Sequence, residues 1–147
     1  MTDLEKIRKW LATYPKFDIL GKLQVDYIDK VAAISSLAPS GLEEIEKKED
    51  ILGNSTITNQ YNFALYAVFE KPPDDDIRAA YNADWVMEFQ KWVQEQGVKN
   101  LVPLFGNTEE KETAKAQNGM LFEQEDEGLA VYIVQLSITY KTFYGGE

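Results

Sequence analysis

The sequence predicts an α+β fold, namely a mainly antiparallel sheet with long hairpin strands, covered on one face by two helices. Two segments, 56–69 and 130–144, alternate apolar and polar residues over an unusual length. Two others, 2–14 and 77–97, space their apolar residues as helices do. Because the helical segments do not alternate regularly with the strands, an antiparallel sheet is favoured over a parallel α/β arrangement.

The composition is that of one globular domain. The chain has 147 residues, 44% of them hydrophobic, which suits a single core and predicts one domain over 1–147. It contains no cysteine and no histidine, so thiolate nucleophiles, zinc–thiolate sites and catalysis by a histidine base are excluded. A net charge of −10 argues against general affinity for nucleic acid or anionic lipid.

No targeting or membrane-spanning signal is found. The N-terminal residues lack the apolar run of a signal peptide, and no stretch of about 20 apolar residues occurs. We therefore expect a protein made and kept in the cytoplasm of its cell, with no membrane partner.

The first predicted element is a short amphipathic helix, with Thr2 and Glu5 as a capping box and Pro15 ending it. The apolar stripe of this helix consists of Leu4, Ile7, Leu11 and Tyr14. Trp10 is expected to lie beside the stripe. A strand is predicted from Lys22, and a second short strand is possible over 30–34. Residues 35–41 read as a turn.

The segment 42–50 is ambiguous. Glutamate and lysine favour a helix, but its apolar residues form no helical stripe, and Gly53–Asn54 is a turn dipeptide leading into the next strand. We predict a strand that is exposed to solvent on both faces and forms a hairpin with the strand that begins at Thr56. A surface helix is the alternative.

The returning strand is predicted to be too long for its own domain. One of its faces carries Ile57, Tyr61, Phe63, Leu65 and Phe69. The other is polar at first and turns apolar from Ala64, so the second half should be buried on both sides. About 14 residues at roughly 3.3 Å each exceed the usual strand length. Part of this strand must therefore project beyond the body.

The second half of the chain is predicted to contain the main helix and another long strand. The helix is expected to end at Gly97 and to pack an aromatic stripe on the sheet; the stripe consists of Tyr81, Trp85, Phe89, Trp92 and Val93. A polar connection follows, with a turn or two of helix over 108–116, a short strand over 120–123 and a turn over 125–128. The last strand has one apolar face, made by Ala130, Tyr132, Val134, Leu136, Ile138, Tyr140 and Tyr144.

No catalytic or cofactor motif is present. Glycine-rich phosphate loops and the G-x-S-x-G elbow are absent, and Ser40 has no histidine to activate it. Carboxylates cluster in EEIEKKED, PPDDD and EQEDE, beside turns, which favours solvated surface over a catalytic or metal site. We expect no cofactor and no enzymatic activity. A small enzyme or ligand-binding module that uses these acids is the alternative.

Three blocks, SGLEEIEKKEDILGNSTITNQYNFALYAVFEK, DWVMEFQKWVQEQ and VPLFG, carry a resemblance that covers nearly the whole chain. The sequence resembles a family of small minor capsid or tail proteins of phages and prophages of Gram-positive bacteria. It looks similar to tail-terminator proteins of contractile-tailed phages.

The resemblance implies a structural subunit that forms a ring, typically a hexamer, capping the tail tube and meeting the neck. Its implied partners are copies of itself, the tail tube and the neck proteins, with the sheath protein as a further candidate and DNA passing without specific binding. It would be found in the bacterial host cytoplasm during assembly and then in the virion tail. A head–tail connector or head-completion protein is the alternative.

Two groups of residues are candidates for this role. Phe105, Asn118 and Phe143 are candidate contacts with another subunit or the tube, although a core position would equally suit Phe105 and Phe143. If a ring encloses a DNA passage, acidic walls would repel phosphates. The candidate lumen acids are Glu43, Glu44, Glu46, Glu123 and Glu125.

Overall fold

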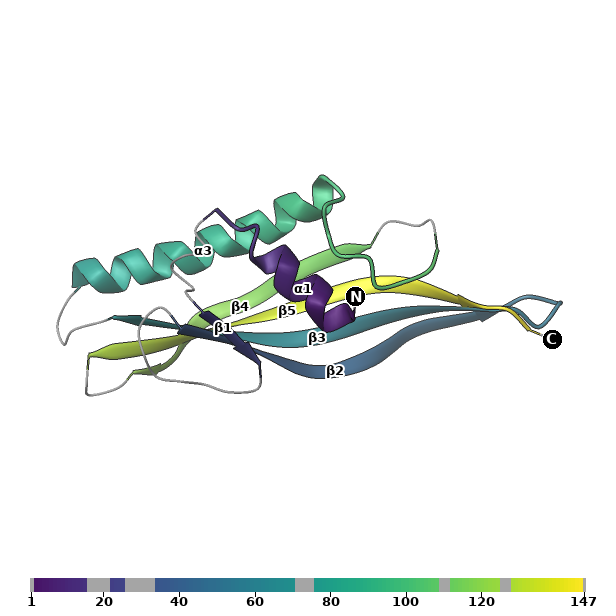
Figure 1. Cartoon of the computed structure of the whole chain (residues 1–147), viewed down its shortest axis with the longest axis horizontal. Coiled ribbons are helices and arrows are strands. Elements are labelled where there is room, and N and C mark those ends of the chain that lie inside the picture. Colours follow the sequence, from purple (N-terminus) through teal and green to yellow (C-terminus); the bar gives the residue numbers. More distant parts are fainter. Residues whose placement is uncertain are drawn as a thin grey trace.

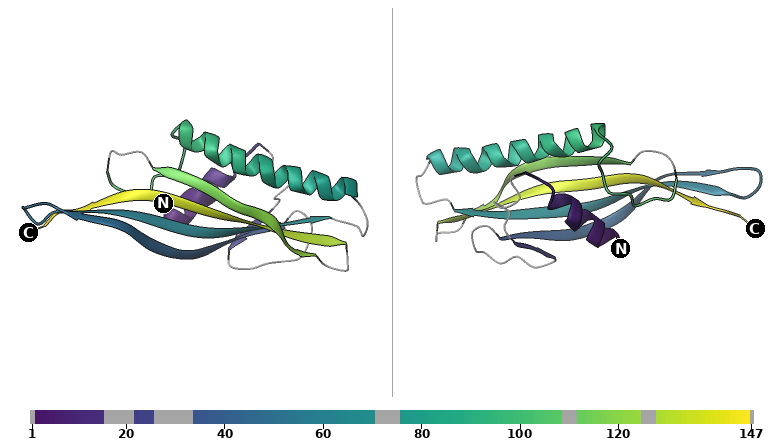
Figure 2. Two further views of the ribbon diagram at one scale, coloured as in Figure 1. Left: turned by 180° about the vertical axis from the view of Figure 1, so that it is seen from behind. Right: turned by 45° about the horizontal axis from the view of Figure 1, so that its top comes forward.

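The computed structural model describes residues 2–15, 22–25, 34–70, 76–108, 112–124 and 128–146. They form one twisted sheet with two helices on the same face (Figures 1 and 2). The predicted α+β class is thereby confirmed. Neither helix among the described residues combines the length and apolar character needed to cross a lipid bilayer.

The sheet has five strands in the order β1-β2-β3-β5-β4. Their bounds are Lys22–Val25 (β1), Ile34–Glu49 (β2), Ser55–Glu70 (β3), Thr113–Gln124 (β4) and Leu129–Tyr144 (β5). Strands β2, β3, β5 and β4 pair antiparallel, whereas β1 runs parallel to β2. Most of the possible strand at 30–34 lies outside the described residues, and Ile34 begins β2.

The two central strands follow the predicted alternation. Phe63 pairs with Leu136 and Leu65 with Val134, and all four side chains are buried under the helices. On the opposite face, Val68 is buried but Tyr66 is only half-buried. The predicted burial of the second half of β3 on both sides therefore holds only in part.

Helix α1 spans Asp3–Leu11 and begins as predicted. The Thr2 hydroxyl accepts the backbone N–H of Glu5 at 3.2 Å, which is the forward half of the capping box. Trp10 is more buried than predicted, because its ring stacks on Trp92 and its Nε1 donates to Gln96 Oε1 at 3.1 Å. These contacts join α1 to the second helix.

Helix α3 spans Asp76–Val98 and packs an aromatic stripe on the sheet. The side chains of Trp85, Phe89 and Val93 are buried, as predicted, but Tyr81 is exposed beneath the guanidinium of Arg78. At 3.6 residues per turn, Tyr81 lies about 80° around the helix from Phe89, so it reaches the rim of the buried face.

The C-terminus of α3 is capped by Asn100 and not by Gly97. Asn100 adopts φ 58°, and its N–H donates to the carbonyl of Gly97 at 3.3 Å. The N–H of Leu101 donates to the carbonyl of Gln96 at 3.0 Å. These paired bonds form a Schellman motif, in which asparagine takes the left-handed position usual for glycine.

An interlocked aromatic cluster fills the space between helices and sheet. Tyr14 contacts the rings of Trp85, Phe89 and Trp92, with centroids 5.0–5.6 Å apart. Burial, assisted by the charge of Glu88, raises the pKa of Tyr14 to about 12. The main hydrophobic cluster therefore lies on the helix-covered face, while Val68 and Val131 are buried on the other face.

Two predicted connections are strands instead. Residues 35–41, expected to be a turn, continue β2 through a β-bulge between Pro39 and Gly41, where Gly41 adopts φ 130°. Pro39 lies beyond the four residues of β2 that pair with β1. Among the described strands it is therefore at the edge of the sheet, where a missing N–H is tolerated. The helical turn expected over 108–116 is also wrong from Thr113 onward, because β4 already pairs with β5 there.

Candidate assembly surface

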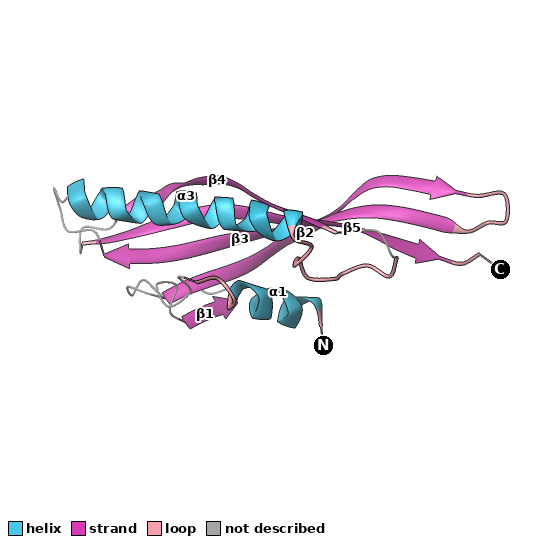
Figure 3. Cartoon of the chain, turned by 90° about the horizontal axis from the view of Figure 1, so that it is seen from above, coloured by secondary structure: helices cyan, strands magenta, loops and turns pink. Residues whose placement is uncertain are grey.

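The sheet extends well beyond the helices as a narrow three-stranded projection, residues 45–58 and 141–146, which we call the arm. Strands β2, β3 and β5 are 16 residues each, so each reaches about 53 Å. Both helices lie over the remainder of the sheet, which we call the body, and the C-terminus lies at the free end of the arm (Figures 1 and 3). The predicted projection of a long strand is thus confirmed.

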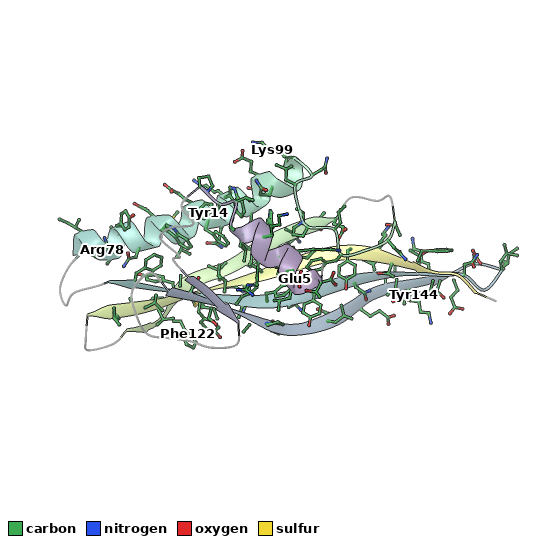
Figure 4. All side chains as sticks on the ribbon, viewed as in Figure 1. Glu5, Tyr14, Arg78, Lys99, Phe122 and Tyr144 are labelled. Carbon is green, nitrogen blue, oxygen red and sulfur yellow. The ribbon has the colours of Figure 1, made fainter. Side chains whose placement is uncertain are left out.

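The arm exposes large apolar side chains. The exposed set consists of Ile45, Ile51, Leu52, Phe143 and Tyr144, and Leu42 is exposed on β2 just before the arm. Single exposed apolar residues are ordinary, but a group on one narrow projection is typical of a contact surface. Figure 4 shows Tyr144 on this projection, away from both helices.

The hairpin turn at the end of the arm, residues 50–54, is held by the Asp50 carboxylate. The N–H groups of Leu52 and Asn54 donate to its Oδ1 at 2.9 and 3.0 Å, and Asn54 Nδ2 donates to its Oδ2 at 3.0 Å. These bonds, from Asn54 first, lower the pKa of Asp50. Ile51 and Leu52 are consequently presented outward on an ordered turn, 102% and 76% exposed.

The C-terminal residues support this turn from the side. The N–H of Gly146 donates to Asn54 Oδ1 at 2.9 Å. A Cβ at position 146 would collide with the backbone of Gly53, so only glycine allows this approach. The turn is therefore braced by its own carboxylate and by the chain end.

The two edges of the arm differ. On the β2 side, β1 pairs only with Ile34–Leu37, and no described strand pairs with the outer edge of β2 beyond that point. On the β5 side, Asn107 closes the edge: its Nδ2 donates to the carbonyl of Phe143 at 3.0 Å, and its Oδ1 accepts the N–H of Phe143 at 2.7 Å. Among the described residues, the β2 edge of the arm is thus left open for pairing, whereas Asn107 covers the β5 edge at Phe143.

The segment that closes the β5 edge, residues 101–108, is held by Glu112. This buried carboxylate accepts the N–H of Phe105 at 2.6 Å and that of Gly106 at 3.4 Å. Burial raises the pKa of Glu112, and the backbone hydrogen bonds offset part of this increase. Gly106 passes so close to the Lys141 carbonyl that a Cβ would collide with it.

The three predicted contact residues have different surroundings. Phe105 belongs to the core margin, with its ring 5.6 Å from Tyr140 and 6.4 Å from Phe63 between centroids. Asn118 is exposed in the β-bulge of β4, where its Nδ2 donates to Gln135 Oε1 at 3.0 Å. Phe143 is half exposed on the arm. Of the three, Phe143 alone lies on the arm.

The predicted lumen acids are not brought together. Glu43, Glu44 and Glu46 are exposed on β2, Glu46 in the arm and the other two just before it. The backbone of Glu123 pairs with Val131 at the opposite end of the sheet, its side chain is outside the described part, and Glu125 lies wholly outside it. Glu43 pairs with Gln60, which pairs with Thr139 of β5, whereas Glu123 pairs with Val131 of β5. The backbones of Glu43 and Glu123 are therefore separated by the eight residues from Val131 to Thr139, roughly 26 Å.

The face opposite the helices carries a shallow, neutral concavity of about 470 Å³. Its polar lining consists of Ser40, Gln60, Asn62, Tyr66, Gln117, Gln135 and Ser137, with no carboxylate, lysine or arginine. Within the described ranges, no three acidic side chains gather as a metal site would require. This surface can donate and accept hydrogen bonds, but it holds no group suited to proton transfer at neutral pH.

The most informative residues were not predicted. Asp50, Asn107 and Glu112 each bond to backbone groups elsewhere in the chain or in their own turn. Of the three, Asp50 could have been found from the sequence, because an Asp three residues before Gly53 is typical of a turn.

Comparison with known proteins adds no identification: no protein-family model matches the sequence, and a search of curated proteins finds no significant match.

Proposed function

We propose that this chain is a structural subunit that assembles with copies of itself, as a ring-forming tail terminator of a phage or prophage. In this role a ring, typically of six subunits, caps the tail tube and joins it to the neck. The proposal combines the resemblance carried by the sequence blocks with the architecture of the arm.

The observation that carries the proposal is the projecting arm. It has an open β2 edge and a group of exposed apolar side chains, and it lies outside the helix-covered core. An open strand edge can pair with a strand of another chain, and such pairing leads to aggregation unless a defined partner covers the edge. A subunit ring supplies such a partner and repeats the contact at every interface.

The acidic strand β2 gives the proposal a second part. Residues 42–50 hold five acidic residues and two lysines. Glu46 and Glu49 pair with Lys48 and Lys47 at 3.4 and 3.2 Å, but these exposed pairs only partly offset the negative charge. If this strand faces the passage, it repels DNA phosphates. Replacing Glu43, Glu44 and Glu46 with lysine should then slow DNA ejection, and unchanged ejection would count against a lumen position.

A tube-capping assay tests the main proposal. Tail tube protein is polymerised with and without the purified chain, and tube lengths are measured by electron microscopy. The wild-type chain should bind tube ends and stop elongation, whereas Ile51→Asp/Leu52→Asp should not. Ile77→Asp, an equally exposed site on α3, is the matched control and should cap normally. Unchanged tube lengths with the wild type, together with binding to portal protein, would favour a connector.

A further inference from the structure

A groove lies between the two helices, outside the arm. It has a volume of about 550 Å³ and lies where α1 passes the C-terminal end of α3. Its lining consists of Lys6, Lys9, Trp10, Thr13, Gln96, Leu101 and Pro103. In Figure 4, Lys99 marks this end of α3.

The groove is built and mostly apolar. Trp10 is fixed by stacking on Trp92 and by its bond to Gln96, so it forms a rigid wall. Lys6 Nζ donates to the carbonyl of Leu104 at 2.7 Å and holds the opposite wall in place. Leu101 and Leu104 remain exposed beside it. A preformed apolar groove of this size is typical of a binding site.

The end of the arm offers apolar side chains and an exposed carboxylate to such a groove. Its turn presents Ile51 and Leu52 as an ordered apolar knob, and beside it lie the exposed carboxylate of Glu49, paired with Lys47 at 3.2 Å, and that of Asp50, which is bonded within the turn. The groove has an apolar floor and two lysines. An ordered knob loses little conformational entropy on binding, and complementary charges set its orientation.

We propose that the turn 50–54 of one copy docks in the α1–α3 groove of the next copy, with Ile51 and Leu52 on Trp10 and Leu101, and with Glu49 facing Lys9. This inference rests on the proposed self-assembly and names its interface. The occupant is a second copy because the turn lies at the free end of the arm, beyond both helices, and cannot reach its own groove (Figure 1).

The contact is heterologous, because the turn of each subunit meets a different surface on its neighbour. A head-to-tail contact of this kind closes into a ring when its rotation allows, and otherwise makes a filament. Each subunit then uses one turn and one groove. The apolar exposure at the end of the arm and at residues 101–104 is removed in the same step.

Cysteine pairing tests this contact directly, because the chain has no cysteine of its own. Leu52→Cys/Leu101→Cys, oxidised under mild conditions, should give a ladder of covalent multimers on a non-reducing gel. Each single variant can give at most a dimer, and an equimolar mixture of the two singles should give the mixed dimer. Leu52→Cys/Ile77→Cys, with both sites exposed, is the control and should give no ladder.

A charge exchange provides a second readout. Lys9→Glu or Glu49→Lys alone should weaken assembly roughly two- to fivefold, and the two together should restore it. If the reduced wild-type chain assembles but the cysteine pair gives no more ladder than the control, the docking contact is wrong and self-assembly stands. If the wild type stays monomeric, both proposals fail.

Discussion

The body and the arm are built from the same strands but differ in what covers them. In the body, Leu65 is 1% exposed beneath α3 and the aromatic cluster, whereas Leu52 at the end of the arm is 76% exposed. The strand alternation continues through both parts, so the pattern of the strand does not by itself decide burial. The comparison shows that burial is concentrated where the helices lie, which leaves the side chains of the arm available for contacts outside the subunit.

The same contrast holds for polar groups. In the body, Glu112 is buried and holds the backbone N–H groups of Phe105 and Gly106, which are partly buried. In the arm, Asp50 does similar work in full contact with solvent. Burial raises the pKa of Glu112, while hydrogen bonds lower that of Asp50. The contributions of the two carboxylates to folding stability therefore change with pH in opposite directions.

The largest expected effect comes from making one substitution in both regions. Leu65→Ala leaves a cavity in the body and should lower the free energy of unfolding by about 2–5 kcal/mol. Leu52→Ala removes a side chain that solvent already surrounds and should change it by less than about 0.5 kcal/mol. Denaturant unfolding followed by circular dichroism measures both. Equal losses would mean that the arm belongs to the folding core.

Much of the fold could be predicted from local pattern. The alternation around Phe63 and Leu136 identified the buried face of both central strands, and Thr2 with Glu5 identified the start of α1. The absence of a helical stripe in 42–50 predicts the hairpin through Gly53, which the pairing of β2 with β3 confirms. These features depend on neighbours in sequence, which is why the sequence was sufficient.

Other features depend on partners distant in sequence. Residues 113–116 have a helical composition but pair with β5, and the pairing overrides propensity. Pro39 and Gly41 resemble a turn, but a bulge absorbs them into β2. The sequence makes Phe105 a candidate contact because no neighbour in sequence covers its side chain. In the structure, Phe63 and Tyr140 cover it from strands β3 and β5. The groove between α1 and α3 could not be predicted from the sequence for the same reason, since it exists only when the two helices are packed side by side.

A smaller effect is expected at Glu112. Glu112→Ala leaves the N–H groups of Phe105 and Gly106 without their acceptor and should cost about 1–3 kcal/mol in the free energy of unfolding. Glu112→Gln keeps an acceptor of similar shape without the charge, so it serves as the conservative control. Denaturant unfolding at several pH values measures both.

The pH dependence has a defined sign. Because the pKa of Glu112 is raised in the folded chain, the native state holds this proton more tightly than the unfolded state. Its contribution is fully present below the ordinary glutamate pKa and is lost as pH rises through the folded value. Glu112→Gln should therefore gain stability relative to wild type over that interval. A relative loss there would contradict the assignment.

The smallest expected effect concerns the closed edge of the arm. Asn107→Ala removes both bonds to the backbone of Phe143 and should cost roughly 0.5–1.5 kcal/mol while accelerating hydrogen exchange at the Phe143 amide. Asn107→Asp keeps the acceptor for that amide but loses the donor to the carbonyl. It should therefore retain more of the protection, and unchanged exchange in both variants would show that Asn107 does not close this edge.

The central claim is that the arm is the contact element between copies of this chain. Native mass spectrometry over a concentration series tests it most directly, using wild type, Ile51→Asp/Leu52→Asp and the control Ile77→Asp, each shown to be folded by circular dichroism. We predict that wild type and control form one closed species with a fixed number of chains, while the arm variant stays monomeric at the same concentrations. Assembly of the arm variant to the wild-type extent would contradict the claim.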